Sequence, residues 1–183
     1  MMNSCRANEQ TKERVVYTIG HSNHTLSHFL GLLWKYGIEV VADIRSQPYS
    51  RYVPHFNQKK LERVLTRSGI KYLYLGKELG GRPKEPEFYD EGGIVNYSRM
   101  AESEPFQRGM ACLIEELSKY RVTLMCGEED PTMCHRRLLV GRALAGQGIT
   151  VYHIRGDGQL ETEAQLKAEK KVEGRKFQQL SLF

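Results

Sequence analysis

The sequence contains no apolar run long enough to form a transmembrane helix, which excludes an α-helical integral membrane protein. Its first fourteen residues are polar and lack the apolar segment typical of a signal peptide. We therefore expect a cytoplasmic protein with no membrane partner. The chain also has no internal repeat and no low-complexity segment, and 183 residues fit one globular domain.

Cysteine is scarce as well, with four residues at irregular spacing. This pattern is not typical of a disulfide framework. Cys5 lies in the polar N-terminal segment, and Cys112 lies in an apolar helical pattern that indicates a core position. Cys126 and Cys134 are the two that have polar neighbours, so we expect a chemical site near them.

The sequence also has no excess of negative charge: its formal net charge is +5 and its pI is about 9.0. A basic balance of this size permits binding of nucleic acid or phosphate but does not require it.

Short apolar runs alternate with helical patterns along most of the chain, which predicts an α/β fold. We expect a single domain with a mostly parallel sheet and helices on both faces. The irregular segment 76–95 is long enough to indicate a functional loop. The expected strands are 15–19, 40–44, 70–75, 122–125 and 149–154. The expected organisation is a flexible N-terminus (1–14), an α/β domain (15–160), a charged helix or linker (161–178) and a separate tail (179–183).

Polar side chains follow three of these strands, and a helix start adds more. The carboxyl ends of parallel strands meet at one edge of a sheet, where ligands bind. Asp130 and Pro131 are typical of the start of a helix that runs to about Ala145. The sequence therefore predicts one polar, candidate catalytic site, formed by His21, Asp43, Arg45, Cys126, Glu128, Cys134, His135 and Arg136.

The two thiols of this site allow three interpretations. Cys126, Cys134 and His135 could bind zinc or another divalent metal, with His21 as a further ligand, because thiolates and imidazole suit such ions. Alternatively, a helix N-terminus could lower the pKa of Cys134 and make it a nucleophile, with His135 or His21 as its base. In the third interpretation both thiols are small apolar fillers of the core.

Charged residues outside the thiol pair also have two interpretations. Asp43 is either a site residue or the buried partner of Arg45 in a structural ion pair. A further set of basic residues either binds phosphate or nucleic acid, with Tyr49, Tyr52 and Tyr89 stacking on bases, or forms an ordinary solvated surface. That set is Arg51, Lys77, Arg82 and Arg137.

Four separated motifs resemble the bacterial and archaeal domain-of-unknown-function 488 family, from about Val15 to Ile154. They are Thr18–Ser22 (TIGHS), Val41–Pro48, Leu79–Arg82, and Cys126-Gly-Glu through Pro131 to Cys134-His-Arg136. The resemblance implies an α/β fold and points to the same eight candidate residues. It does not imply a particular reaction.

A weaker similarity is to rhodanese-like domains, in which a Cys after a central strand carries sulfur. This similarity implies a thiol or sulfur-transfer enzyme with Cys126 as the sulfur carrier. The loop after Cys126 differs from an anion-binding loop because it carries Glu128, Glu129 and Asp130.

The last five residues, Gln179, Leu180, Ser181, Leu182 and Phe183, resemble the short motif by which bacterial polymerases and repair proteins bind the replicative sliding clamp. Alternatively, they pack on the domain as a strand or a helix end. If the tail binds the clamp, the sequence favours a protein of bacterial DNA metabolism or repair whose polar site binds or processes nucleic acid. The alternatives are a sulfur-transfer enzyme and a non-catalytic binding module.

Overall fold

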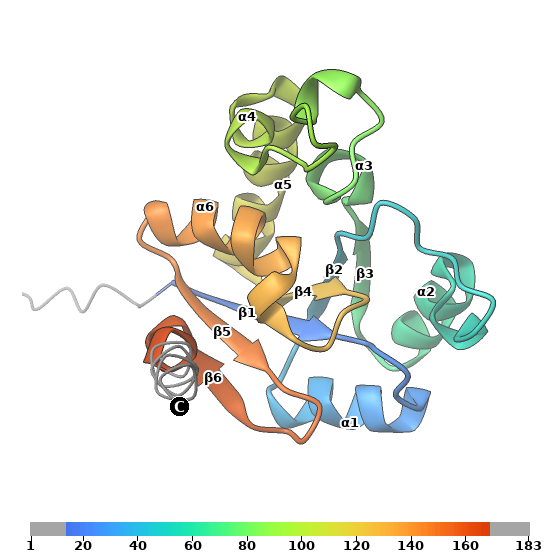
Figure 1. Ribbon diagram of the computed structural model, residues 1–183. Coiled ribbons are helices and arrows are strands. Elements are labelled where there is room, and N and C mark those ends of the chain that lie inside the picture. The colour runs from blue at the N-terminus through green and yellow to red at the C-terminus, as the bar shows by residue number, and fades with distance from the viewer. Residues whose placement is uncertain (1–13, 169–183) are drawn as a thin grey trace, which may run out of the picture.

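The computed structural model describes residues 14–168, which form one six-stranded sheet in the order β3-β2-β4-β1-β5-β6 (Figure 1). The first five strands are parallel, and β6 is antiparallel to β5 at one edge. The expected α/β fold with a mostly parallel sheet is thus confirmed. The strands are β1 (Val15–Gly20), β2 (Val40–Asp43), β3 (Lys71–Tyr74), β4 (Val122–Cys126), β5 (Thr150–Ile154) and β6 (Leu160–Thr162).

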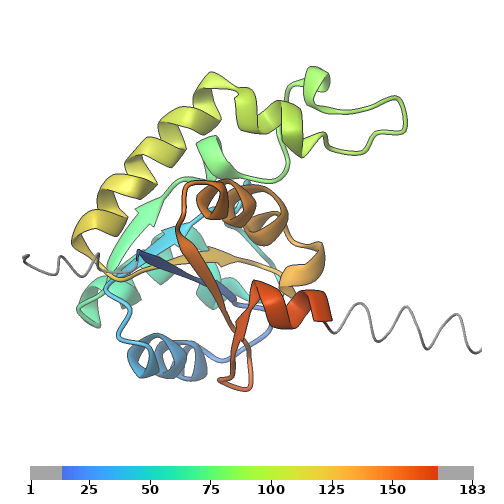
Figure 2. The same ribbon diagram turned by 90° about the vertical axis from the view of Figure 1, so that its left-hand side faces the viewer.

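Helices cover both faces of this sheet (Figures 1 and 2). One face carries α1 (Leu26–Lys35), the 3-10 turn η1 (Pro54–Phe56) and α2 (Gln58–Arg67). The other face carries α3 (Gly76–Leu79), α4 (Tyr97–Glu102), α5 (Glu104–Lys119), the π-helix η4 (Arg136–Gly141) and α6 (Arg142–Gly146). Two further 3-10 turns are η2 (Pro86–Phe88) and η3 (Pro131–Met133).

Alternate residues of each central strand enter two separate cores. Val40 and Ala42 pack among the residues of the α5 and α6 face, whereas Val41 packs with those of α1 and α2. Leu124 and Met125 divide in the same way. Strands buried on both faces are apolar throughout, which is why these segments were recognisable as short continuous apolar runs.

The central strands β2, β4 and β1 are neighbours and end at nearly the same level. Asp43 lies opposite Met125, and Gly20 lies opposite Cys126. Pairing continues past the strand end, where the His21 amide donates to the carbonyl of Cys126 at 3.0 Å. The loops after these three strands therefore emerge side by side, as the polar strand ends predicted.

The segment after Asp130 is not the single helix that the sequence predicted. Asp130 does cap the first turn, because its side chain accepts from the Thr132 amide. The turn η3 then ends at Cys134, whose backbone is extended (φ −102°, ψ 141°), before η4 and α6 begin. The extended Cys134 thus separates η3 from the helical residues that begin at His135.

The strand β6 is a second departure, since we expected a charged helix from residue 161. Instead Leu160–Thr162 pairs with β5, and Glu161 forms an ion pair with Arg155 at 3.0 Å. Residues 163–168, the last that the structure describes, are helical. The tail 179–183 and the N-terminal segment 1–13 lie outside the described residues. Across residues 14–168, no helix is both long and apolar enough to cross a membrane.

Candidate functional site

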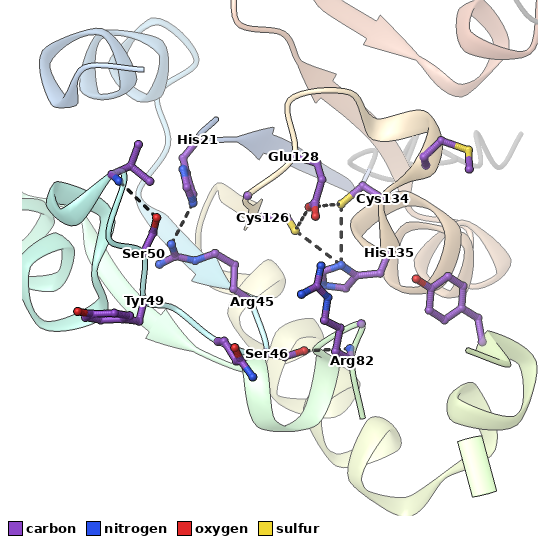
Figure 3. A pocket seen from close by; sticks show the side chains of 16 residues that line it. His21, Arg45, Ser46, Tyr49, Ser50, Arg82, Cys126, Glu128, Cys134 and His135 are labelled. Atoms are coloured by element: carbon purple, nitrogen blue, oxygen red, sulfur yellow. Dashed lines mark hydrogen bonds between the residues drawn. The ribbon is translucent and has the colours of Figure 1, made fainter. Parts of the chain in front are cut away.

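A cavity of about 370 Å³ lies at the carboxyl ends of β1, β2 and β4 (Figure 3). Six of the eight predicted site residues line it, and they come from all three strand ends and from the segment before η4. They are His21, Arg45, Cys126, Glu128, Cys134 and His135. Asp43 and Arg136 do not line the cavity and lie completely buried behind it.

Four of the lining residues form a ligand cluster, consisting of Cys126, Glu128, Cys134 and His135. Their donor atoms all lie within 4.8 Å of one another (Figure 3). The His135 Nδ1 atom is 3.6 Å from Cys126 Sγ and 3.9 Å from Cys134 Sγ. A Glu128 carboxylate oxygen is 2.7 Å from Cys126 Sγ and 3.4 Å from Cys134 Sγ. This set of sulfur, nitrogen and oxygen atoms could hold a metal ion.

The orientation of His135 is fixed from outside the cluster. Its Nε2 atom donates to the carbonyl oxygen of Ile44 at 2.9 Å, so Nε2 carries the proton and the lone pair of Nδ1 faces the thiols. Gly81 packs closely against His135, because a Cβ atom at Gly81 would lie 2.5 Å from Cγ of His135. The absence of a side chain at Gly81 thus leaves room for the imidazole at the cavity wall.

Both thiols of the cluster are buried. The hydrogen bond with Cys126 and burial raise the pKa of Cys134 well above its usual range. The expectation of a low pKa at Cys134 is therefore wrong. The Cys134 carbonyl accepts from the amides of Arg137 and Leu138 at the helix start, but the hydrogen bond with Cys126 and burial of the thiol outweigh this position. For Glu128, burial opposes ionisation, but hydrogen bonds from Cys126 and other groups outweigh it and lower its pKa.

The opposite wall of the cavity is built on an arginine anchor, which consists of Asp43, Arg45 and His21. Asp43 accepts from Arg45 Nε at 2.9 Å and from Arg45 Nη2 at 2.6 Å. It also accepts from the hydroxyl of Tyr72 at 2.7 Å. Arg45 Nη2 donates further to the carbonyl of Phe56 at 2.9 Å, and Nη1 lies 3.0 Å from His21 Nε2. These contacts make Asp43 the buried partner of Arg45.

His21 is held as a neutral imidazole within this anchor. Its Nδ1 atom donates to the carbonyl of Ser22 at 2.8 Å, which leaves Nε2 to accept from Arg45. Its ring stacks on Phe56 with the centroids 4.4 Å apart. Burial and the neighbouring Arg45 guanidinium lower the pKa of His21 to about 4.

Arg136 holds the loop that carries Glu128. Its guanidinium lies fully buried and donates to the carbonyl oxygens of Glu128 and Glu129. On the other side of this loop, a Cβ atom at Gly20 would lie 1.8 Å from the Glu128 carbonyl oxygen. The π-helix supplies the arginine, and π-helical turns are frequent at functional sites.

The four residues predicted to bind phosphate separate in space. Arg82 lines the cavity, and its backbone amide donates to Ser46 at 3.0 Å. Arg51 and Lys77 are exposed but do not line the cavity. Arg137 points elsewhere and forms a bidentate ion pair with Glu163, at 2.8 and 3.0 Å.

Residues 25–143 match the profile of a family described as a domain of unknown function, DUF488. The chain belongs to the DUF488 family. The matched region contains Asp43, Arg45 and all four ligand-cluster residues, and it begins after His21. No curated protein matches the chain.

The DUF488 region also contains cavity residues that sequence reasoning missed. Tyr97 begins α4 directly after the Asn96 cap, and Met133, which is 79% exposed, stands at the rim. Asn96 is a residue type that commonly caps helices, so the helix start was predictable from the sequence. The position of the Tyr97 side chain at the cavity was not. Of the tyrosines expected to stack, Tyr49 lines the cavity and is 72% exposed, whereas Tyr89 does not line it.

Proposed function

We propose that this DUF488 protein acts in bacterial DNA metabolism or repair, and that its cavity binds and processes nucleic acid. One observation carries the proposal: a single cavity combines a cationic side chain, a highly exposed tyrosine and the ligand cluster. Arg82 supplies the positive charge and Tyr49 the aromatic surface. Proteins that bind single-stranded nucleic acid combine these two features, because phosphates attract cations and every base has a face that stacks.

Arg45 adds a hydrogen-bond donor for such a ligand. A guanidinium has five N–H donors. Among the described residues, acceptors engage Nε, both hydrogens of Nη2 and one of Nη1. One Nη1 hydrogen remains, and Arg45 lines the cavity. The anchor therefore offers a fixed donor that needs no rearrangement when an anionic or carbonyl group enters.

Fluorescence anisotropy with labelled single-stranded and duplex DNA at several salt concentrations tests this function. The affinity should fall as salt rises, because bound phosphates release counterions. Tyr49→Ala should weaken binding of single strands by about 1–3 kcal/mol if one base stacks there. Arg82→Ala should reduce the slope of the salt dependence by about one.

Matched controls are Trp34→Ala and Arg108→Ala, which remove an exposed aromatic residue and an exposed arginine away from the cavity. Neither should change DNA binding. An absence of salt-dependent binding to single-stranded, duplex or damaged DNA would refute the proposal, as would equal losses in the cavity and control variants.

The clamp connection rests on the tail sequence alone. Gln179 would hydrogen-bond at the rim of a pocket on the sliding clamp, and Leu182 and Phe183 would enter it. Burial of each apolar side chain contributes roughly 1.5–3 kcal/mol. After the cost of ordering the peptide, an affinity of about micromolar remains, which suits a reversible tether.

A titration of purified clamp with the full-length protein and with a chain lacking 179–183 tests the tether. The full-length protein should bind, and both the truncated chain and Leu182→Ala/Phe183→Ala should not. Their thermal midpoints should match that of the full-length protein. If the full-length chain fails to bind at high micromolar clamp, or if truncation unfolds the domain, the tail is not a clamp tether.

Sulfur transfer remains the second candidate, because Cys126 follows a central strand and lines the cavity. Its surroundings favour it less, since its thiol meets the Glu128 carboxylate at 2.7 Å and a carboxylate repels a persulfide anion. Thiosulfate and persulfide assays on the wild type and Cys126→Ser separate the candidates. Activity that requires Cys126 would establish this function in place of the first.

A further inference from the structure

We propose that Cys126, Cys134 and His135 bind Zn²⁺ with one coordination position open to the cavity, and that Glu128 takes a proton from the water bound there. This makes the cluster a hydrolytic centre. The inference rests on the proposed function only for its substrate, an amino-bearing nucleobase. The metal site itself stands on the geometry of the cluster.

The spacing of the three buried donors fits a tetrahedral zinc ion. Zinc–sulfur and zinc–nitrogen bonds of about 2.3 and 2.0 Å place tetrahedral sulfur and nitrogen ligands about 3.5 Å apart. The distances from His135 Nδ1 to the two sulfur atoms are 3.6 and 3.9 Å. Two thiolates and an imidazole also form a soft donor set, which favours zinc over magnesium or calcium.

The surroundings of His135 are those of a metal ligand. Metal-binding histidines usually donate their second ring N–H to a carbonyl or carboxylate, which fixes the tautomer and the ring plane. The Ile44 carbonyl has this role here. The lone pair of Nδ1 then points at the two thiols (Figure 3).

Glu128 is placed beside this ligand set rather than within it. Its oxygen lies 3.4 Å from Cys134 Sγ but only 2.7 Å from Cys126 Sγ, and the second distance is that of a hydrogen bond, shorter than the about 3.5 Å between two ligands of one tetrahedral zinc. Its side chain is exposed, while the other three residues are buried. The fourth zinc position therefore faces the cavity, which is the arrangement of catalytic rather than structural zinc sites.

The reaction needs only water and the substrate. Zinc lowers the pKa of bound water to about 7. Glu128 accepts one proton, and the remaining hydroxide forms a C–O bond at the ring carbon that carries an amine. The protonated Glu128 then returns its proton to the amine as the C–N bond breaks, which yields ammonia and a carbonyl. Zinc held by cysteines and a histidine, beside a glutamate that is not a ligand, performs this chemistry in nucleobase deaminases.

Metal analysis of the full-length protein tests the site without DNA. We expect one zinc per chain by mass spectrometry, and the cobalt-substituted protein should show the charge-transfer absorption of two thiolates. Cys126→Ser and Cys134→Ser should each lower zinc affinity at least about 100-fold, whereas Cys112→Ser, on α5, should bind as the wild type does. A protein without stoichiometric zinc, or a cobalt spectrum without thiolate bands, overturns the proposal even if a cysteine variant fails to fold.

Glu128→Gln distinguishes the open site from a closed one. The variant should keep one zinc and the wild-type cobalt spectrum. If the variant loses zinc as the cysteine variants do, Glu128 is a fourth ligand and the open position is refuted.

Ammonia release tests the substrate. The zinc-loaded wild type should release ammonia from single strands that contain cytosine or adenine but not from oligothymidylate, which has no exocyclic amine. Glu128→Gln should lose this activity while keeping its zinc. Zinc binding without ammonia release overturns the assigned substrate. DNA binding without zinc overturns only this inference, and zinc without DNA binding overturns only the proposed function.

Discussion

The two walls of the cavity are both polar, yet they are built on opposite principles. In the arginine anchor, each charged group meets a complementary partner: Asp43 accepts from Arg45 and Tyr72, and Arg45 donates to His21 and a carbonyl. In the ligand cluster, the two thiols donate to the Glu128 carboxylate, and sulfur, nitrogen and oxygen atoms that could hold a metal converge. Within residues 14–168, no lysine or arginine forms an ion pair with Glu128.

This difference assigns separate tasks to the walls. A buried polar network whose charged groups are paired and hydrogen-bonded adds rigidity. A cluster of metal-ligating atoms without a bound cation adds little to the free energy of unfolding. Such clusters are retained because they bind a ligand. We therefore expect substitutions in the anchor to cost stability and substitutions in the cluster to cost ligand binding.

The largest effect should come from Asp43→Asn. The carboxylate is completely buried, and its removal leaves the Arg45 charge without a partner. Removal of one member of a buried ion pair costs roughly 3–5 kcal/mol. Urea unfolding of the variant measures this loss. Glu104→Gln is the matched control, because it removes the exposed partner of Arg108 and should change stability little. An Asp43 variant as stable as the wild type would return Asp43 to the catalytic candidates.

The next largest effect is a pH dependence of the free energy of unfolding, which His21 causes. Its pKa is about 4 in the folded protein, below the value of about 6.5 in the unfolded chain, so the unfolded state binds the proton first. Stability from this residue is complete above pH 6.5 and falls as the pH drops toward 4. The loss between pH 7 and pH 5 is about 2 kcal/mol.

Denaturant unfolding of the wild type and His21→Gln across this range isolates the contribution. The curve of the variant should be shallower between pH 6.5 and 4. Parallel curves would mean that the anchor tolerates an imidazolium beside Arg45 and is looser than its hydrogen bonds indicate.

Glu128→Gln should change the stability of the metal-free protein by less than about 1 kcal/mol, since the side chain is exposed and has no cationic partner. Zinc at 100 times its dissociation constant should stabilise the wild type by about 2.7 kcal/mol. Thermal unfolding with and without zinc tests both statements. A metal-free loss as large as that of Asp43→Asn would show that the two walls do not differ.

The sequence was sufficient to predict the convergence of His21, Arg45 and Cys126, because the ends of neighbouring parallel strands must meet. It did not predict which groups each individual side chain contacts. Arg136 and Arg137 are adjacent, yet the first turns inward to two loop carbonyls and the second pairs with Glu163. That division depends on the π-helix and on β6, neither of which has a recognisable signature in hydrophobic periodicity.

The smallest effect leaves the fold unchanged and concerns the reactivity of the thiols. Cys126 and Cys134 are buried, and the hydrogen bond with Cys126 together with burial raises the pKa of Cys134, so little of the Cys134 thiol is ionised at neutral pH. Cys112 is partly exposed on α5 and should react first with a maleimide at pH 7, although its pKa is also raised by burial. Mass spectrometry of Cys5→Ser protein after timed labelling gives the three rates. Zinc should slow labelling of Cys126 and Cys134 further, and a chelator should reverse this without changing the rate at Cys112. If Cys134 reacts fastest, the ligand cluster instead contains an activated nucleophile. The two walls would then differ in that one carries a reactive thiol and the other a structural ion pair.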